Sequence, residues 1–335
     1  MKRLVPLLGA AGLLLLIGLI AYTGWPALQQ AFAHAGWPLL LLVPAHLLPL
    51  ALDTQAWRVL LEPIDPDRSA SLRFLLWVAA VREAVARLLP AAGIGGEVVG
   101  IRLSRLRLAN TTAVAATVVV EVLITIAVQY LFCGLGIVLM LHVTPGASQV
   151  WTLSAGLLLS LPLPLLAFLL LRHGAVFARI EQWAIQLFGD SGRLAFPLNG
   201  MQLDADLRRL FAQPWRLAQA LLWQFAGYLI GSLETWFALT LLGHPVSLET
   251  ALAIEALTQA VRHATFMVPG GLGVQEAGVV LFGHLAGVSG EAALALALVK
   301  RAREILFGLP ALLSWHWVEA RVVRQARSAQ SSGLS

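Results

Sequence analysis

The stretch that decides the fold of this chain is RLLPAAGIGGEVVG, residues 87–100. It places one proline, four glycines and one glutamate among neighbours that are mostly leucine, alanine and valine. A second stretch, FMVPGGLGVQEAGVV, covers residues 266–280, and in both a glutamate follows the proline by seven positions. Since proline removes a backbone donor and glycine permits sharp turns, each stretch predicts a break between two helical segments.

The composition of the whole chain is that of a helical membrane protein. Of its 335 residues, 59% are hydrophobic and 12% are charged. A bilayer solvates so much apolar surface directly, whereas a soluble domain of this size cannot bury it. The net charge of +5 comes from Lys and Arg scattered between apolar runs. That distribution is typical of cytoplasmic loops and not of a nucleic-acid-binding surface.

Six apolar runs have the length of about 20 residues that a membrane crossing requires. They are residues 4–22, 38–61, 111–131, 150–171, 216–242 and 291–317. The first is expected to be a retained helix, because it exceeds the roughly 7–15 apolar residues of a signal peptide. Residues 70–108 and 250–285 contain the two breaks and are too short on either side for two crossings. Both are predicted to be re-entrant helical hairpins, which protein or a watered cavity must cover.

The predicted fold class is therefore an all-α polytopic membrane protein, with about six transmembrane helices and two re-entrant hairpins. Its basic loops and both termini then share one face, which the positive-inside rule makes cytoplasmic. The loops on the other face, residues 23–37, 142–149 and 243–249, contain no Lys or Arg. We expect a single membrane domain over residues 1–326 and, because it is small and polar, a disordered tail at 327–335.

The cytoplasmic connection, residues 172–215, is the one part that resembles a soluble segment. Its apolar residues recur at helical spacing from Val176 to Phe188. This pattern predicts an amphipathic helix that either lies in the membrane interface or packs on the membrane domain. The acidic pair Asp204 and Asp206 sits beside two arginines and is expected to form a solvated helix turn.

Polar landmarks recur at a spacing close to 180 residues, which predicts an internal repeat over residues 38–132 and 216–317. Asp53 corresponds to Glu234, Arg82 to Arg262, Pro90 to Pro269, Glu97 to Glu276 and, more loosely, Glu121 to Glu304. The predicted topology makes the two repeats cross the membrane in opposite directions. Inverted repeats of this kind are typical of transporters, whose site lies at the repeat interface beside discontinuous helices.

The candidate site combines the residues of the breaks with charges inside the apolar runs. A charge at the centre of a membrane helix costs about 2.5–3.5 kcal/mol, so these groups are expected to face one another or a cavity. The residues assigned to substrate binding and transport are Arg82, Arg87, Pro90, Gly93, Gly95, Glu97, Glu121, Glu234, Arg262, Pro269, Gly271, Gly273, Glu276, Arg301 and Glu304.

The half-helix that begins after each break presents unpaired N–H groups, which suit an anion such as a lipid phosphate. Arg82 and Arg262 are candidates for the same headgroup, because a guanidinium binds phosphate through two hydrogen bonds. Pairing of these arginines with Asp53 or Glu234 is the alternative. The glutamates after the breaks either cap their own helices or bind a cation or a proton during transport.

Cofactor and metal sites are not expected. The histidines lack the spacing of a zinc site, and the single cysteine excludes a cysteine cluster. The segment GLGVQEAG has no strand–helix context for binding a dinucleotide, and a G-x-S-x-G elbow does not occur. The expected partner is a membrane lipid, and no nucleic acid or catalytic residue is predicted.

The stretches RLLPAAGIGGEVVGIRLSR and VPGGLGVQEAGVVLFGHLAGVSGEAALALALVKRAREI resemble the flippase-like family, the transmembrane domain of lysylphosphatidylglycerol synthases. The stretch VAAVREAVARLLPAAGIGGEVVG is similar to stand-alone members encoded with hopanoid-biosynthesis genes. The resemblance implies translocation of an amphiphilic lipid, a hopanoid or a phospholipid, across the bacterial inner membrane. In the synthases a separate soluble domain carries aminoacyl transfer. This chain ends at Ser335 without one, so we expect it not to be an enzyme.

Two other classes remain as alternatives. One is a membrane-embedded lipid transferase that uses buried carboxylates as acid and base. The other is a non-catalytic scaffold for lipid-biosynthesis enzymes, in which neutralising Glu97 and Glu276 would hardly change activity. The inverted repeat and the buried charges favour a transporter over both.

Overall fold

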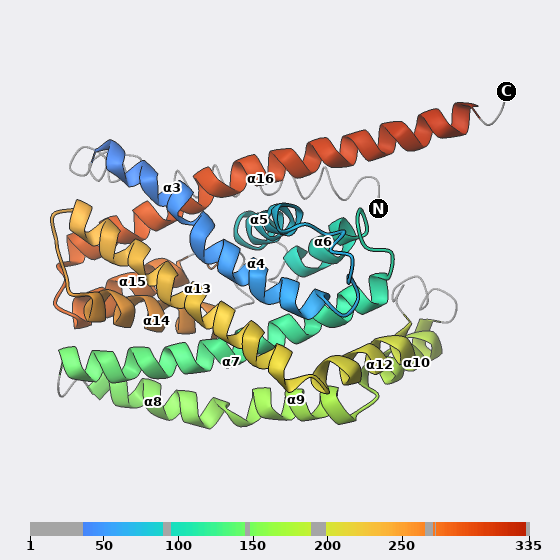
Figure 1. Cartoon of the computed structure of the whole chain (residues 1–335). Coiled ribbons are helices and arrows are strands. Elements are labelled where there is room, and N and C mark those ends of the chain that lie inside the picture. The colour runs from blue at the N-terminus through green and yellow to red at the C-terminus, as the bar shows by residue number, and fades with distance from the viewer. Residues whose placement is uncertain are drawn as a thin grey trace.

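A computed structural model describes residues 36–89, 95–144, 148–188, 199–264, 271 and 273–332. In these ranges the chain forms helices packed side by side and contains no strand (Figure 1). The expected all-helical class is thus confirmed for the described residues. The apolar run at 4–22 lies outside them.

The molecule consists of two halves joined by a connection. We call η1 and α3 to α7 the first half, and α13 to α16 the second half. The first half consists of η1 (Trp37–Leu41), α3 (Leu42–Ala45), α4 (Leu47–Leu61), α5 (Leu72–Leu88), α6 (Gly95–Ser104) and α7 (Thr111–Val143). The connection consists of α8 (Ser148–Ser160), α9 (Pro162–His173), α10 (Val176–Phe188) and α12 (Gly200–Phe211). The second half consists of α13 (Pro214–Leu241), α14 (Leu248–Ala264), α15 (Val274–Leu285) and α16 (Gly290–Ser332).

Three helical stretches of the described chain are long and apolar enough to cross a membrane. They are Trp37–Leu61, Thr111–Val143 and Ser154–His173. The expected runs at 216–242 and 291–317 fall in α13 and α16, where polar and charged residues such as Gln224 and Lys300 interrupt the apolar sequence. Three of the six expected crossings therefore meet the requirement by length and composition.

Both sequence breaks separate two helices that pack against each other, α5 with α6 and α14 with α15. The prediction of a helix break in each stretch is thus confirmed. Gly271 and Gly273 have φ values of 63° and 75°, a left-handed conformation that glycine adopts without the steric cost of a Cβ. The predicted site residues Pro90, Gly93 and Pro269 lie outside the described residues.

The two halves contact each other through several pairs of helices. Helix α4 packs along α13, α5 packs on α16 of the other half, and α14 packs on α7 (Figure 1). Small residues permit the closest approaches: a Cβ at Gly308 would lie 2.6 Å from Leu88, and one at Gly136 would lie 2.6 Å from Ala256. Such small-residue contacts are typical of helices in lipid, where van der Waals packing drives association.

Helices α8 and α9 form the most exposed apolar part of the described chain. None of the residues in the apolar window of Ser154–His173 is buried, and Leu159 is 83% exposed. Pro162 is in the first turn of α9. The N–H groups there have no partner within the helix, so the missing N–H of proline costs no hydrogen bond. This surface suits contact with lipid tails, which solvate leucine directly.

Helices α10 and α12 cap each other in the connection. Asp204 accepts hydrogen bonds from the N–H groups of Phe177 (3.2 Å) and Ala178 (2.9 Å), and Glu181 accepts one from Gly200 (2.7 Å). Asp204 thus caps the neighbouring helix α10. Asp204 and Asp206 are both buried, so the expectation of a solvated turn is wrong for the pair. The amphipathic helix is confirmed as α10, with Trp183 70% exposed. Its position at the membrane interface stays a prediction.

The C-terminal tail expected to be disordered, residues 327–335, overlaps the end of a helix. Helix α16 continues to Ser332, so residues 327–332 are helical in the structure, and residues 333–335 lie outside the described part.

Candidate functional site

A polar cavity of about 260 Å³ lies between the two halves. Its walls come from α4, α5, α6 and α7 on one side and from α13, α14 and α16 on the other. Charged side chains from both halves line it: Asp53, Arg82, Glu83, Arg87, Glu97, Glu121, Glu234, Glu255 and Arg303. The polar space thus lies at the contact between the halves.

The first charged cluster joins the three helices α5, α6 and α7. Arg82 of α5 donates a hydrogen bond to Glu97 of α6 and forms a 2.9 Å ion pair with Glu121 of α7. Its guanidinium lies 4.8 Å from the centre of the Trp57 ring, within the range of a cation–π contact. Trp57 in turn donates to the hydroxyl of Thr117 at 3.1 Å. We call Arg82, Glu97 and Glu121 the open cluster, because all three line the cavity.

Two glycines of α6 make the open cluster possible. A Cβ at Gly96 would lie 2.5 Å from the backbone oxygen of Arg82, and one at Gly100 would lie 2.5 Å from its Cδ. The glycines are four residues apart and therefore share one face of α6. The GGEVVG segment thus brings α6 close to α5 and leaves room for the arginine side chain.

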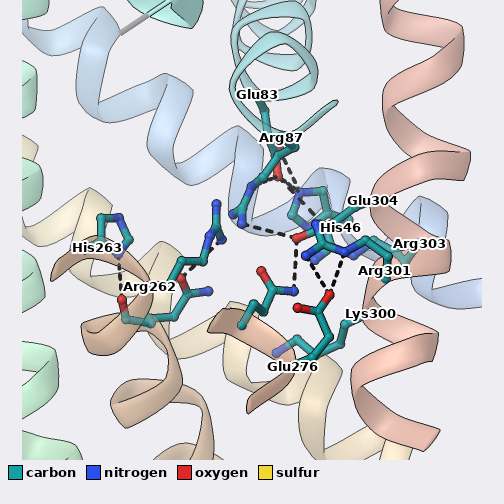
Figure 2. Close-up of polar contacts among 12 residues, drawn as sticks. His46, Glu83, Arg87, Arg262, His263, Glu276, Lys300, Arg301, Arg303 and Glu304 are labelled. Carbon is teal, nitrogen blue, oxygen red and sulfur yellow. Dashed lines mark hydrogen bonds and ion pairs between the residues drawn. The ribbon is translucent and has the colours of Figure 1, made fainter. Parts of the chain in front are cut away.

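The second charged cluster is centred on Arg301 of α16, and its residues converge in Figure 2. Arg301 donates to Glu276 of α15 at 2.6 Å and to Glu304 at 2.7 Å. Glu304 also accepts hydrogen bonds from Gln275 at 3.3 Å and from Arg87 of α5 at 3.2 Å. The side chains of Arg301 and Glu304 are only 2% and 1% exposed. We call Glu276, Arg301 and Glu304 the sealed cluster.

A third group links the halves through a histidine at the joint of α3 and α4. His46 Nδ1 lies 2.8 Å from Glu234 Oε1, and His46 Nε2 lies 2.9 Å from Glu83 Oε2. Arg303 lies 3.4 Å from Glu234 and 3.9 Å from Glu83 (Figure 2 shows its position). Glu83 and Glu234 come from different halves, so His46 bridges them.

A fourth group surrounds Glu255 of α14. Lys300 contacts this carboxylate and donates to Thr235 at 3.0 Å, while Gln259 donates to Glu255 at 2.9 Å. The four side chains satisfy one another, which a buried charge requires. Asp53 of α4 differs, because its buried Oδ1 has no hydrogen-bond partner among the described residues. It lies where α13 comes close, since a Cβ at Gly227 would be 2.7 Å from this oxygen.

Most of the described residues that the sequence assigns to the site belong to these clusters. Arg82, Glu97 and Glu121 come together in the open cluster, and Glu276, Arg301 and Glu304 in the sealed one. Arg82 pairs with Glu97 and Glu121, so its expected alternative partners Asp53 and Glu234 are wrong. Arg262 of α14 points to Gln259, with its Nη1 3.5 Å from the amide oxygen, and stands apart from the sealed cluster (Figure 2).

The glycines and the remaining charged residues of the predicted site lie outside the open and the sealed cluster. Gly95 is the first residue of α6, and Gly271 lies beside the side chain of Arg262. Arg87 and Glu234 reach into the contact between the halves.

Sequence reasoning missed His46 and Glu83. Glu83 could have been found, because it stands beside Arg82 and forms an i,i+4 ion pair with Arg87 at 3.6 Å. His46 gives no such signal.

The comparison with protein families agrees with these features. The model described as the lysylphosphatidylglycerol synthase TM region matches residues 8–311. The chain belongs to this family. It is therefore a multi-pass membrane protein, and the family match includes both helix breaks and every charged cluster described above. No curated protein and no solved structure matches the chain.

Proposed function

We propose that this member of the family moves an amphiphilic lipid, a hopanoid or a phospholipid, across the bacterial inner membrane. The observation that carries the proposal is the charged cavity between the halves of an otherwise apolar helical bundle. Ionisable groups inside membrane proteins are costly, and they mark substrate or ion pathways where they line a cavity. In this function the cavity takes the polar headgroup while the tails stay in lipid, and the chain is no enzyme.

The packing of the halves supports an inverted repeat as the framework of this transport. In a two-fold arrangement, each contact between unlike elements of the two repeats must occur twice. The contact of α5 with α16 has its counterpart in that of α14 with α7, and α4 meets its own counterpart α13. Transporters with inverted repeats place the substrate at this interface and move one repeat against the other.

The open cluster is the headgroup site in this proposal. Arg82 is held beside the cavity by Trp57 and by two carboxylates, and Glu97 is its most exposed partner, with 29% of its side chain accessible. A lipid phosphate would replace Glu97 on the guanidinium, because arginine binds phosphate and carboxylate in the same geometry. The carboxylate of Glu97 is then released toward the cavity.

Lipid analysis combined with a transport assay tests the proposal. Wild type, Arg82→Gln and Glu97→Gln are purified, and their bound lipids are compared with the bulk membrane by mass spectrometry. Each protein is then placed in vesicles with fluorescent phospholipid, whose movement between leaflets is followed by quenching from outside. Arg102→Gln is the matched control, since Arg102 pairs with Glu319 at 2.8 Å on the surface. We expect an enriched lipid and lipid movement in wild type and control, and loss of both in Arg82→Gln. Glu97→Gln removes the carboxylate that displaces the phosphate again, so it should keep the enriched lipid and slow its movement.

Transport would be contradicted if the bound lipids matched the bulk membrane and lipid movement matched that of protein-free vesicles in every sample. The scaffold alternative would then explain the chain better, with lipid-biosynthesis enzymes as its partners.

The re-entrant hairpins and the cytoplasmic termini belong to the same proposal. A cysteine is placed after each break, at Val98 or Ala277, in a Cys133→Ser background, and is labelled with a reagent that does not cross membranes. The two sites should be reached from opposite faces of sealed vesicles. Labelling of both from the same face would contradict the inverted arrangement.

A further inference from the structure

The His46 bridge has the geometry of a site that holds a proton. Both ring nitrogens lie within 2.9 Å of a carboxylate oxygen, Nδ1 of Glu234 and Nε2 of Glu83. A neutral imidazole has only one N–H to donate, and an ionised carboxylate has none. Two hydrogen bonds to two carboxylates therefore require one proton more than the neutral histidine carries.

The surroundings place this proton on the imidazole. Arg303 contacts both carboxylates, and Arg87 lies 3.6 Å from Glu83, so each carboxylate has a cationic neighbour. The edge of the His46 ring packs on Phe307, with the ring centres 5.0 Å apart. The charged and titratable groups that face His46 are Glu83 and Arg87 of α5, Glu234 of α13, Arg303 of α16 and Asp53 of α4. The two arginines also disfavour binding of a metal cation between the carboxylates.

We propose that Glu83, His46 and Glu234 form a proton-binding site that opens to the cavity and joins the two halves while it is occupied. All three residues line the cavity, which gives the proton an exchange path. When the proton leaves, one ring nitrogen becomes an acceptor that faces a carboxylate, and one of the two hydrogen bonds is lost. The occupied site thus ties α5 of the first half to α13 of the second. The vacated site weakens this link, although Arg303 still faces both carboxylates.

This site would couple movement of the halves to protons, and that part rests on the proposed transport function. Contacts between halves that break and reform are what alternating access requires. Binding of the proton itself does not depend on which lipid, if any, is moved.

Nitrogen NMR of protein in lipid, with 15N-labelled histidine, tests the proton site directly. The two protonation states of the ring have distinct nitrogen signals, and His46 is assigned by its absence in His46→Gln. A histidine with its ordinary pKa loses this proton near pH 6.5. His142, which is 75% exposed, is the control, and its signal is assigned by its absence in His142→Gln. We expect the His46 ring to keep both protons above that range, and to lose one there in Glu83→Gln.

A wild-type spectrum with no doubly protonated histidine above that range would overturn the proposal without any variant. An unchanged His46 signal in Glu83→Gln would also overturn it, because the carboxylate would then not hold the proton.

Coupling is tested in vesicles with and without a proton gradient. We expect the gradient to accelerate lipid movement by wild type and by His142→Gln, and the acceleration to be lost in His46→Gln. If wild type moves lipid at the same rate with and without the gradient, coupling is overturned and the transport function is not. If no lipid moves at all, the transport function fails, and the NMR experiment still decides the proton site.

Discussion

The open and the sealed cluster place one arginine between two glutamates, yet they differ in origin and exposure. In the open cluster the arginine comes from the hairpin helix α5, and the side chains of Arg82, Glu97 and Glu121 are 11%, 29% and 10% exposed. In the sealed cluster the arginine comes from α16, and the side chains of Arg301, Glu304 and Glu276 are 2%, 1% and 16% exposed. The glutamates correspond at the repeat spacing, but the arginines do not.

This difference predicts separate roles for the two clusters. Water and a headgroup can reach a partly exposed ion pair, so the open cluster can exchange partners. No residue of the sealed cluster lines the cavity, and Arg87 further ties this cluster to the first half through Glu304 at 3.2 Å. We therefore expect the open cluster to govern transport and the sealed cluster to govern stability.

The largest effect is expected from Arg301→Met. The substitution leaves Glu276 and Glu304 without their main cationic partner in a buried place, which typically costs about 3–5 kcal/mol of stability. Thermal unfolding in detergent or lipid measures the loss. Arg102→Met is the control, because exposed pairs such as Arg102–Glu319 contribute about 0–1 kcal/mol. Equal stability of the two variants would show that the sealed cluster does not hold the helices together.

A smaller effect on stability, with a larger one on transport, is expected from Arg82→Met. Glu97 and Glu121 both line the cavity and can face it when their partner is removed, so the loss should stay near that of a charged hydrogen bond, about 1.5–3 kcal/mol. Lipid movement should fall to the level of protein-free vesicles. If Arg82→Met unfolds the protein as readily as Arg301→Met, the division of roles between the clusters is wrong.

Gly100 of α6 and Gly278 of α15 allow the same comparison for the contacts between helices, since each faces the helix that precedes its break. A Cβ at Gly100 would overlap the Arg82 side chain, and overpacking of this kind costs about 1–3 kcal/mol. A Cβ at Gly278 would lie 3.4 Å from Cγ2 of Thr258, an ordinary contact, while alanine favours the helix by about 1 kcal/mol. We expect Gly100→Ala to lower the unfolding midpoint and reduce lipid movement, and Gly278→Ala to leave both unchanged or raise the midpoint. An equal fall of the unfolding midpoint and of lipid movement in both variants would contradict a difference in packing between the two helix pairs.

The smallest effect is expected at the turns that precede the hairpins. Before α5, Asp65 accepts hydrogen bonds from the N–H of Ser69 (2.8 Å), its hydroxyl (2.6 Å) and the N–H of Ala70 (2.9 Å). Burial alone would raise the pKa of Asp65, but these hydrogen bonds hold the pKa below its ordinary value. Before α14, the neutral Ser247 accepts from the N–H of Thr250 at 3.1 Å.

Because the pKa of Asp65 is lowered on folding, its contribution is present above the ordinary aspartate pKa and is lost as the pH falls below it. Asp65→Asn should therefore cost about 1 kcal/mol at neutral pH and lose less stability than wild type on acidification. Unfolding midpoints measured across the acidic range check this, with Ser247→Ala as the variant whose effect should not depend on pH. A wild type and an Asp65→Asn variant with parallel midpoints would contradict the role of the carboxylate.

The sequence by itself determined the membrane class, the helix breaks and most members of the charged clusters. These properties are local, since a run of apolar residues, a proline among glycines or a charge in an apolar helix can be recognised without knowing its neighbours. The family resemblance rests on the same local stretches, and the match over residues 8–311 agrees with it.

Only the tertiary structure decided which charges meet. Lys300, Arg301 and Arg303 are close in sequence, yet they pair with Glu255, with the sealed cluster and with Glu234, because successive residues of a helix point in different directions. The repeat spacing suggested Arg262 as the counterpart of Arg82, whereas packing placed Arg301 between the glutamates. His46 gained both of its partners from helices distant in sequence. Such pairings depend on the facing surfaces of packed helices, which no local pattern specifies.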